Sequence, residues 1–378
     1  MKFSCLQENL AQGLQVVGRI SNKNINLPIL NNVLIIADEN LKLISTNLEI
    51  AVTCVIRAKI EEKGSFTIPA KLLTDYIDVI NQGRIDLELK ENEVLIKTGN
   101  DQSKIKGTTA NDFPVIPNFT RENKYSLSVE GFKRMVQQVL FSAAKTESRP
   151  GLSGLLFDFN PEGRNGVLVV AATDSYRLAE KELKITSGAP SNQKIIVPAK
   201  TIQELLRIVS SYHPDLEGET PLEVIINENK VLFVYGPVEL TSRLIDGRYP
   251  NYRQIIPTSF KTVVNLSIGE LIKRVKAASL FSNVNASSGV SLDFKANQDQ
   301  KVVISSVNGQ MGESWSEMLC LVNGEDNKTL LNSRYLLDGL MNLGAEEAVL
   351  KIISGDSPCL LTAKDGTDYL YIIMPIRQ

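Results

Sequence analysis

The chain has 378 residues, with 43% hydrophobic and 22% charged side chains and a formal net charge of −2. These values are typical of a soluble globular chain with several cores, and they exclude a largely disordered protein. No segment approaches the roughly 20 apolar residues of a membrane span, and no apolar run of signal-peptide length follows the amino terminus, so we expect a cytoplasmic protein.

Two landmarks recur three times along the chain, in the same order. A strand-like start that leads into an amphipathic helical pattern occurs at MKFSCL (1–6), KYSLSV (124–129) and KTVVNL (261–266). A second helical pattern opens at IPAK (68–71), VPAK (197–200) and LNSR (331–334). The final residues of these motifs, Lys71, Lys200 and Arg334, are 129 and 134 residues apart. Repeats of this length are domains, because solenoid repeats are only about 20 to 50 residues long.

Each repeat is predicted to run strand, helix, several strands, helix, several strands. Alternating apolar and polar residues on either side of a turn, as in IDLELK (85–90) and VLIK (94–97), predict hairpins and therefore antiparallel sheets. Two amphipathic helices per repeat must cover one face of these sheets. The sequence predicts an α+β fold of three similar domains, at 1–121, 122–258 and 259–378.

Charge is distributed unevenly between the predicted helices and the rest of the chain. The six candidate helical segments together carry +6, which leaves −8 for the strands and loops. These segments are 8–23, 71–84, 130–149, 199–212, 267–283 and 332–343. Basic helices and acidic sheets would give two differently charged surfaces, so a nucleic-acid partner is compatible with the negative net charge.

Few residues could support catalysis. His213 is the only histidine, which largely excludes histidine-based metal clusters and a Ser-His-Asp triad, and no glycine-rich phosphate-binding motif occurs. The four cysteines lie far apart, so we expect buried reduced thiols. A magnesium-dependent nucleic-acid enzyme could still be built from aspartate and glutamate, and a purely structural three-domain protein is a further alternative. We expect no cofactor.

Four ordered motifs point to a known family. ATDSYRLA (172–179) resembles a signature of the β subunit of bacterial DNA polymerase III, the sliding clamp. LPIL (27–30), LIDGRYPNY (244–252) and MPIR (374–377) resemble other motifs of this family, in the family's order. The resemblance implies the DNA clamp fold and a non-catalytic processivity factor. Two copies would close head to tail into a ring of six domains, with twelve helices around duplex DNA and sheets on the outer rim.

The resemblance also implies contacts with DNA and between subunits. The DNA contacts would be with phosphates and independent of sequence. The residues expected to make them are Asn24, Lys71, Lys145, Arg149, Lys200, Arg207 and Lys276. The head-to-tail dimer interface is expected between the first and third repeats, at Ile105, Leu280 and Phe281.

A further implication is a cleft that receives short peptides from the polymerase catalytic subunit, the clamp loader and repair proteins. Apolar residues would accept aliphatic or aromatic anchors of the peptide, while Arg177, Arg377 and Asn332 fix its polar groups. The cleft residues carried over from the family are Leu152, Thr173, Tyr176, Arg177, Leu178, Pro250, Ile255, Asn332, Tyr335, Met374, Pro375, Ile376 and Arg377.

Several positions depart from patterns common in the family. Tyr176 stands where histidine is frequent, Ser287 lies near the place of a bulky aromatic residue, and Ile376 replaces methionine. The chain ends with Gln378, and Asn24 stands where some relatives carry a DNA-contacting arginine. These departures imply a slightly different peptide preference and a weaker DNA contact at Asn24.

Overall fold

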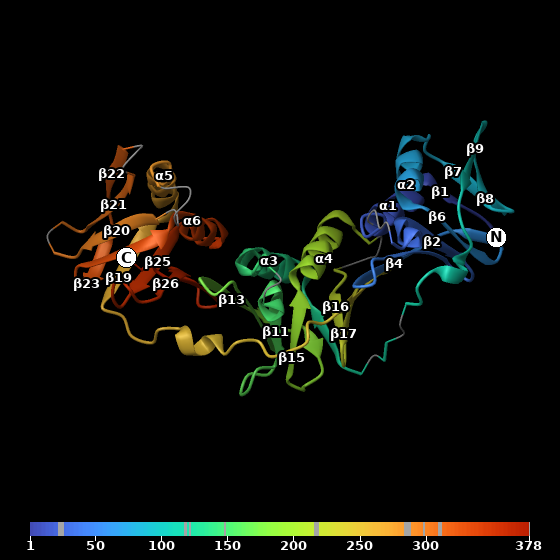
Figure 1. Cartoon of the computed structure of the whole chain (residues 1–378). Coiled ribbons are helices and arrows are strands. Elements are labelled where there is room, and N and C mark those ends of the chain that lie inside the picture. Colours follow the sequence, from blue (N-terminus) through green and yellow to red (C-terminus); the bar gives the residue numbers. More distant parts are fainter. Residues whose placement is uncertain are drawn as a thin grey trace. The chain divides into compact units, whose positions relative to one another are not determined.

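The computed structural model describes residues 1–21, 26–116, 119–120, 122–146, 149–214, 219–282, 289–297, 299–308 and 312–377. They form two compact units, each with two antiparallel sheets (Figure 1). The first unit comprises Met1–Lys133, Ile185–Ala189 and Lys200–Leu244. The second comprises Arg134–Lys184, Pro190–Ala199 and Ile245–Gln378. No helix within the described ranges is long and apolar enough to cross a membrane.

The first repeat lies within the first unit. Its helices are α1 (Gln7–Val17) and α2 (Ala70–Val79). Its strands are β1 (Lys2–Leu6), β2 (Asn32–Ala37), β3 (Leu41–Thr46), β4 (Ile50–Ile56), β5 (Lys59–Glu62), β6 (Gly64–Pro69), β7 (Arg84–Lys90), β8 (Glu93–Thr98) and β9 (Asp101–Lys106). Because Leu10, Leu14 and Val17 form one buried face, α1 packs on β3 and β4, with α2 beside it (Figure 1).

The second repeat contributes to both units. Its helices are α3 (Val129–Val139) and α4 (Ala199–Ser211). The strands that join the first unit are β10 (Lys124–Leu127), β14 (Ser187–Gly188), β16 (Leu222–Asn227), β17 (Lys230–Tyr235) and β18 (Val238–Arg243). The strands in the second unit are β11 (Gly154–Phe159), β12 (Val167–Thr173), β13 (Arg177–Lys184) and β15 (Gln193–Pro198). This division arises because both sheets of the repeat continue into a neighbouring repeat.

The third repeat lies within the second unit. Its helices are α5 (Ile268–Ser279) and α6 (Ser333–Asn342), which pack against each other (Figure 1). Its strands are β19 (Thr262–Ser267), β20 (Gly289–Lys295), β21 (Lys301–Asn308), β22 (Gly312–Leu319), β23 (Leu321–Gly324), β24 (Asn327–Asn332), β25 (Glu347–Ile352), β26 (Cys359–Ala363) and β27 (Tyr369–Ile373). Three similar α+β domains, each with two helices on antiparallel sheets, confirm the predicted fold class; the exact domain boundaries stay a prediction.

The two repeat boundaries within the chain are built from the same kind of strand pair. β4 pairs with β18, with Ala51 opposite Thr241, and β13 pairs with β27, with Leu178 opposite Ile372. β4 and β13 are each the third strand after the first helix of their repeat, and β18 and β27 are each the last strand of theirs. In the other repeats the corresponding strands are β22, the third strand after α5, and β9, the last strand of the first repeat. Both lie at the edge of their sheets as described.

The helices are shorter than the sequence predicted, which changes the distribution of charge. The six α-helices of the described residues carry +2 in total, where the longer predicted segments carried +6. Four basic residues that the sequence placed in helices lie beyond the helix ends: Arg19, Arg84, Lys145 and Arg149. For example, α2 ends before Ile80, where the backbone is extended. The predicted contrast between basic helices and acidic sheets is therefore smaller than expected, and much of the basic excess lies in the segments that follow the helices.

Candidate functional site: an apolar cleft in the second unit

The ATDSYRLA motif forms the hairpin between β12 and β13. The Asp174 Oδ1 atom accepts hydrogen bonds from the backbone N–H groups of Tyr176 (3.0 Å) and Arg177 (3.1 Å). The Thr173 hydroxyl accepts from the N–H of Ser175 (3.1 Å) and donates to the carbonyl of Arg177 (2.6 Å). Ser175 has a φ of 79°, a conformation that the surrounding hydrogen bonds must hold. The motif therefore specifies a rigid turn that fixes the direction of Arg177.

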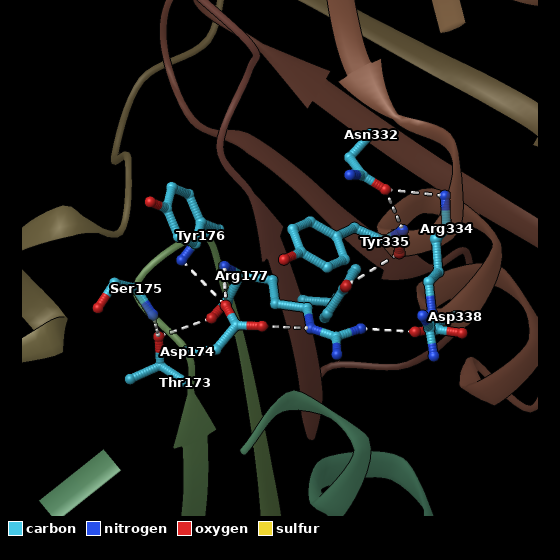
Figure 2. Close-up of polar contacts among 10 residues, drawn as sticks. Thr173, Asp174, Ser175, Tyr176, Arg177, Asn332, Arg334, Tyr335 and Asp338 are labelled. Atoms are coloured by element: carbon cyan, nitrogen blue, oxygen red, sulfur yellow. Dashed lines mark hydrogen bonds and ion pairs between the residues drawn. The ribbon is translucent and has the colours of Figure 1, made fainter. Parts of the chain in front are cut away.

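The Arg177 guanidinium is the buried centre of the site, with 6% of the residue exposed. Its Nε lies 2.9 Å from Asp174 Oδ2, and its Nη1 lies 2.6 Å from Asp338 Oδ2 on α6 (Figure 2). The group also stacks over the Tyr335 ring, 4.5 Å from its centroid. Burial acts to lower the pKa of Arg177, but Asp338 and Asp174 are among the groups that outweigh it and raise the pKa. The two ion pairs of Arg177 therefore connect the β12–β13 hairpin to α6.

The first turn of α6 is fixed beside this hairpin. Asn332 caps the helix, because its Oδ1 accepts from the N–H groups of Arg334 (3.0 Å) and Tyr335 (3.2 Å), as Figure 2 shows. The Tyr371 hydroxyl donates to the carbonyl of Tyr335 at 2.9 Å, and burial raises the pKa of Tyr371, which keeps the hydroxyl protonated. A Cβ at Gly339 would lie 2.3 Å from the Tyr371 ring, so only glycine allows this close packing.

A cavity of about 400 Å³ opens beside this network, with largely apolar walls. Seven of the predicted cleft residues line it: Leu152, Thr173, Arg177, Leu178, Pro250, Ile255 and Met374. A cavity of this size, apolar with a few polar groups, suits the apolar anchor of a short peptide.

The other six predicted cleft residues lie outside the lining of this cavity. They are Tyr176, Asn332, Tyr335, Pro375, Ile376 and Arg377. Figure 2 shows Tyr335 between the hairpin that carries Tyr176 and the capped start of α6. The N–H of Met374 donates to the carbonyl of Tyr176 (2.9 Å), and the N–H of Ile376 donates to that of Leu330 (2.8 Å). The terminal segment is thus held against the hairpin and β24, next to the cavity.

The cavity also contains residues that the sequence did not assign to it. They are Arg149, Pro150, Gly151, Ser175, Arg248, Asn251, Tyr252 and Ile372. Arg149, predicted as a DNA contact, donates from Nη1 to the Ser175 hydroxyl at 3.1 Å and so lies at the cleft. The Tyr252 hydroxyl donates to the buried Glu180. Arg248 and Tyr252 belong to the LIDGRYPNY motif, from which only Pro250 was carried over, so the sequence contained a signal for them.

Five of the predicted DNA contacts are exposed. One is Arg149 at the cleft, and the other four are lysines. They are Lys71 on α2, Lys145 after α3, Lys200 at the start of α4 and Lys276 on α5. Asn24, like Ser287 and Gln378, lies outside the described residues.

Arg207 makes contacts within the chain that the sequence did not predict. Its Nη1 and Nη2 donate to the carbonyls of Gln15 (3.1 Å) and Val16 (2.8 Å) at the end of α1. Its Nε donates to Glu204 at 2.8 Å, and Nη2 also bonds this carboxylate. Four of the five guanidinium N–H groups are therefore used within the first unit. Arg207 therefore links α4 to α1, and its contact with DNA stays a prediction.

The predicted dimer contacts differ in their exposure. Leu280, which follows α5, is 71% exposed, and Phe281 is half-buried, with its ring 4.0 Å from a Cβ built at Gly312 in β22. Ile105 is only 5% exposed, because its side chain points into its own domain, while Lys104 and Lys106 on either side are exposed. Any contact that β9 makes with another chain must therefore use its backbone edge and its outward side chains.

Groups suited to catalysis are not gathered in the described residues. His213 is exposed, and no cluster of three or more histidine, cysteine, aspartate or glutamate residues in these ranges is placed to hold a metal ion. All four cysteines are free; Cys320 is half-buried and the other three are buried. Burial raises the pKa of Cys5 and Cys54 to about 12 and that of Cys320 and Cys359 to about 11, so the thiols stay protonated.

Three clamp-type α+β domains with a preformed apolar cleft define a protein that acts by binding. Family models agree over nearly the whole chain. The N-terminal domain of the DNA polymerase III beta subunit matches 1–117, the central domain matches 126–251, and the C-terminal domain matches 253–377.

Individual relatives match over their full length. The beta sliding clamp of Synechocystis is 28% identical, with 100% of this chain and 99% of the relative covered. That of Pseudomonas aeruginosa is 27% identical, with both chains fully covered. The crystal structure of the DNA polymerase III subunit beta from Pseudomonas aeruginosa has a TM-score of 0.93 at 26% identity, with full coverage of both chains. A structure of the sliding clamp of the same organism bound to griselimycin has a TM-score of 0.91 at 27% identity.

The chain therefore belongs to the DNA polymerase III beta subunit family, the sliding clamps. It is a DNA polymerase processivity factor of the ring-forming clamp type and has no catalytic role. This confirms the family predicted from the four motifs. It also sets aside the two alternatives, a metal-dependent nucleic-acid enzyme and a purely structural protein.

Proposed function

We propose that two copies of this chain close head to tail into a ring around duplex DNA. The observation that carries this proposal is the repeated strand pair at the repeat boundaries. β4 with β18 and β13 with β27 use the same two kinds of strand, and β22 and β9 are the remaining strands of those kinds, each at a sheet edge. Pairing β22 of one copy with β9 of the other would repeat the junction, and a twofold rotation would close the ring.

The internal repeats also predict the register of this intermolecular strand pair. Glu313 pairs with Val307 in its hairpin, as Leu178 pairs with Thr173 and Ala51 with Thr46. Lys104 pairs with Leu95 as Thr241 pairs with Leu232 and Ile372 with Leu360. Since Ala51 faces Thr241 and Leu178 faces Ile372, Glu313 of one copy should face Lys104 of the other. Opposite charges at directly opposed positions favour this pairing.

The ring would hold DNA through its charge and not through its sequence. Lys71, Lys145, Lys200 and Lys276 offer exposed ammonium groups on helices or just beyond their ends. Such groups bind phosphates without reading bases, so the protein could slide. Because the ring encloses the duplex, weak contacts suffice for persistence.

Retention on circular DNA tests this proposal. After loading onto a closed circular duplex by a clamp loader with ATP, the protein should stay bound on dilution and leave when the circle is cut. Equal retention on linear and circular DNA would contradict a ring that encloses the duplex.

A single lysine should contribute modestly to DNA binding. Replacing Lys145 by alanine should weaken binding a few-fold and reduce the slope of log affinity against log salt by about one, without creating a sequence preference. Titration of a labelled duplex at several salt concentrations measures both quantities. Lys42→Ala, which removes an exposed lysine from β3, is the control and should leave the slope unchanged. A base-specific footprint would argue against this mode of binding.

We further propose that the cleft receives short peptides from the polymerase catalytic subunit, the clamp loader and repair proteins. The supporting observation is the cavity beside Arg177. Its lining includes Leu152, Leu178 and Ile255, which would bury an aliphatic or aromatic anchor. Arg149 and Arg248 at the same cavity can bind carbonyl or carboxylate groups of the peptide. A cytoplasmic location would bring the protein together with these partners and is part of the proposal.

Asp338 should act as a positioning residue for this cleft. In Asp338→Asn the side chain keeps its shape but loses the charge that holds Arg177 at 2.6 Å, so the guanidinium keeps only one ion pair. We expect a loss of about 1–2 kcal/mol in folding stability and a several-fold weaker peptide affinity. Thermal unfolding and titration of a fluorescent peptide measure these effects. Asp356→Asn, which neutralises an exposed carboxylate outside the cavity lining, should change neither; equal losses in both variants would show that Asp338 has no particular role.

A further inference from the structure

The helices of the three repeats can be compared position by position. The fourth residue of each helix is fully buried: Leu10, Phe132 and Leu271 in the first helices, and Leu73, Ile202 and Leu336 in the second helices. The ninth residues are then equivalent as well. They are Gln15, Gln137 and Lys276 in α1, α3 and α5, and Asp78, Arg207 and Met341 in α2, α4 and α6.

At both repeat boundaries within the chain, the end of a first helix meets the end of a second helix through a side-chain donor. Arg207, the ninth residue of α4, donates to the carbonyls of Gln15 and Val16 at the end of α1. Gln138 at the end of α3 donates from Nε2 to the carbonyls of Asn342 and Leu343, both at 3.1 Å. The last carbonyls of a helix have no partner within the helix, so each donor stabilises the junction.

The helix ends that would meet between two copies, those of α5 and α2, have different side chains. Asp78 occupies the position of Arg207, and Ala277 occupies the position of Gln138. A carboxylate and a methyl group do not donate to a carbonyl, and a carboxylate near the C-terminus of a helix is unfavourable. Within its own chain, Asp78 Oδ1 accepts an exposed hydrogen bond of 3.5 Å from Gln15 Nε2. Lys276, the ninth residue of α5, is exposed and supplies a cation at the position where Gln15 meets Arg207.

Two exposed apolar side chains flank these charges. Val79 on α2 is 80% exposed, whereas its counterpart Ile208 on α4 is fully buried. Leu280, directly after α5, is 71% exposed. The surface therefore has the apolar residues of a packed junction and oppositely charged residues on its two halves, Asp78 on one and Lys276 on the other. A second copy of this chain fits both features, because it brings the two halves together.

We propose that Asp78 of one copy forms an ion pair with Lys276 of the other copy, over a contact between Val79 and Leu280. This inference rests on the proposed ring and adds how its closure is regulated. The two junctions within each chain are covalently connected and have carbonyl-bound donors, whereas the junction between copies depends on an exposed ion pair that salt screens. Ionic strength then opens the ring at the junctions between copies.

Charge reversal and charge exchange test the pair in the full-length protein. Sedimentation velocity at about 0.05 M and about 0.5 M NaCl would give the dissociation constant of the dimer. Asp78→Lys and Lys276→Asp should each raise it about tenfold or more at low salt, because like charges then face each other at both junctions. Salt should weaken the wild-type dimer and reduce the defect of either reversal. The double variant, with the charges exchanged, should recover wild-type affinity.

Glu162→Lys, a reversal of an exposed charge in the turn between β11 and β12, is the control and should leave the constant unchanged. If the double variant loses as much free energy of dimerisation as its two single changes lose together, the ion pair does not form. Single reversals that dimerise like the wild type would also overturn the ion pair. A wild-type chain that stays monomeric at every concentration would instead overturn the proposed ring itself, so the two failures can be told apart.

Discussion

Replacing Leu280 and Phe281 together by aspartate should convert the dimer into monomers. Leu280 is 71% exposed in the single chain, and Phe281 lies beside Gly312, where edge strand β22 begins. Losing the burial of these side chains costs about 3 kcal/mol at each junction, and a closed ring contains two junctions. The dissociation constant of the dimer should therefore rise by about 10⁴-fold or more. Sedimentation velocity at micromolar concentration would detect the change.

Val115→Asp is the matched control for this double substitution. Val115 is a 93% exposed apolar residue in the segment after β9, and it lies beside residues of β4 and β18, which belong to a junction within the chain. The control should remain dimeric, and Leu280→Asp alone should give an intermediate dissociation constant. Because Phe281 is half-buried, thermal unfolding of each variant would establish that the monomer is folded. An intact dimer in the double variant would show that these residues lie elsewhere in the assembly.

The parts of the fold that local sequence determines were predictable. The triplicated order of helices and strands follows from periodicity, because buried faces such as that of Leu10, Leu14 and Val17 recur at helical spacing. The turn from Thr173 to Arg177 is also local, since its hydrogen bonds join residues two to four positions apart. A motif of this kind identifies both the turn and the family.

Contacts between distant segments were not predictable in the same way. Arg207 has the sequence context of a surface residue on an amphipathic helix, yet it binds carbonyls 191 and 192 positions away in the chain. Arg149 is the last residue of the predicted helical segment 130–149, and only the fold brings it to Ser175. The alternation in β9 shows that Ile105 is on one face but not that this face is covered by its own domain.

Helix ends were the other source of error, and they affected the electrostatic argument most. Amphipathic patterns continue past the last hydrogen-bonded turn, so Arg19, Arg84 and Lys145 were counted as helical although they follow helices. The sign of the predicted effect is unchanged, because the helices still carry a positive total. Much of the positive charge lies in the segments that follow the helices, and Lys145, which we propose as a DNA contact, is in one of them.

Deleting residues 374–378 should separate the two proposed functions of the ring. Met374 lines the cavity, and the N–H groups of Met374 and Ile376 hold the segment to the carbonyls of Tyr176 and Leu330. Removing an apolar cluster of this kind costs about 2 kcal/mol or more, so the affinity for a labelled peptide with leucine and phenylalanine anchors should fall about thirtyfold or more. The deletion touches neither the edge strands β9 and β22 nor the ends of α2 and α5. Dimerisation and retention on circular DNA should therefore persist, while stimulation of processive synthesis is lost.

Two further variants make this result interpretable. Removing Gln378 alone shortens the chain without touching a predicted cleft residue, and it should leave peptide affinity unchanged. Met374→Ala keeps the backbone hydrogen bond to Tyr176 and removes only the side chain from the cavity, so it should give a smaller loss than the deletion. Fluorescence titration of the same peptide compares all three proteins. If the deletion binds this peptide as tightly as the intact chain, the terminal segment forms no part of the peptide site, even though the ring itself stands.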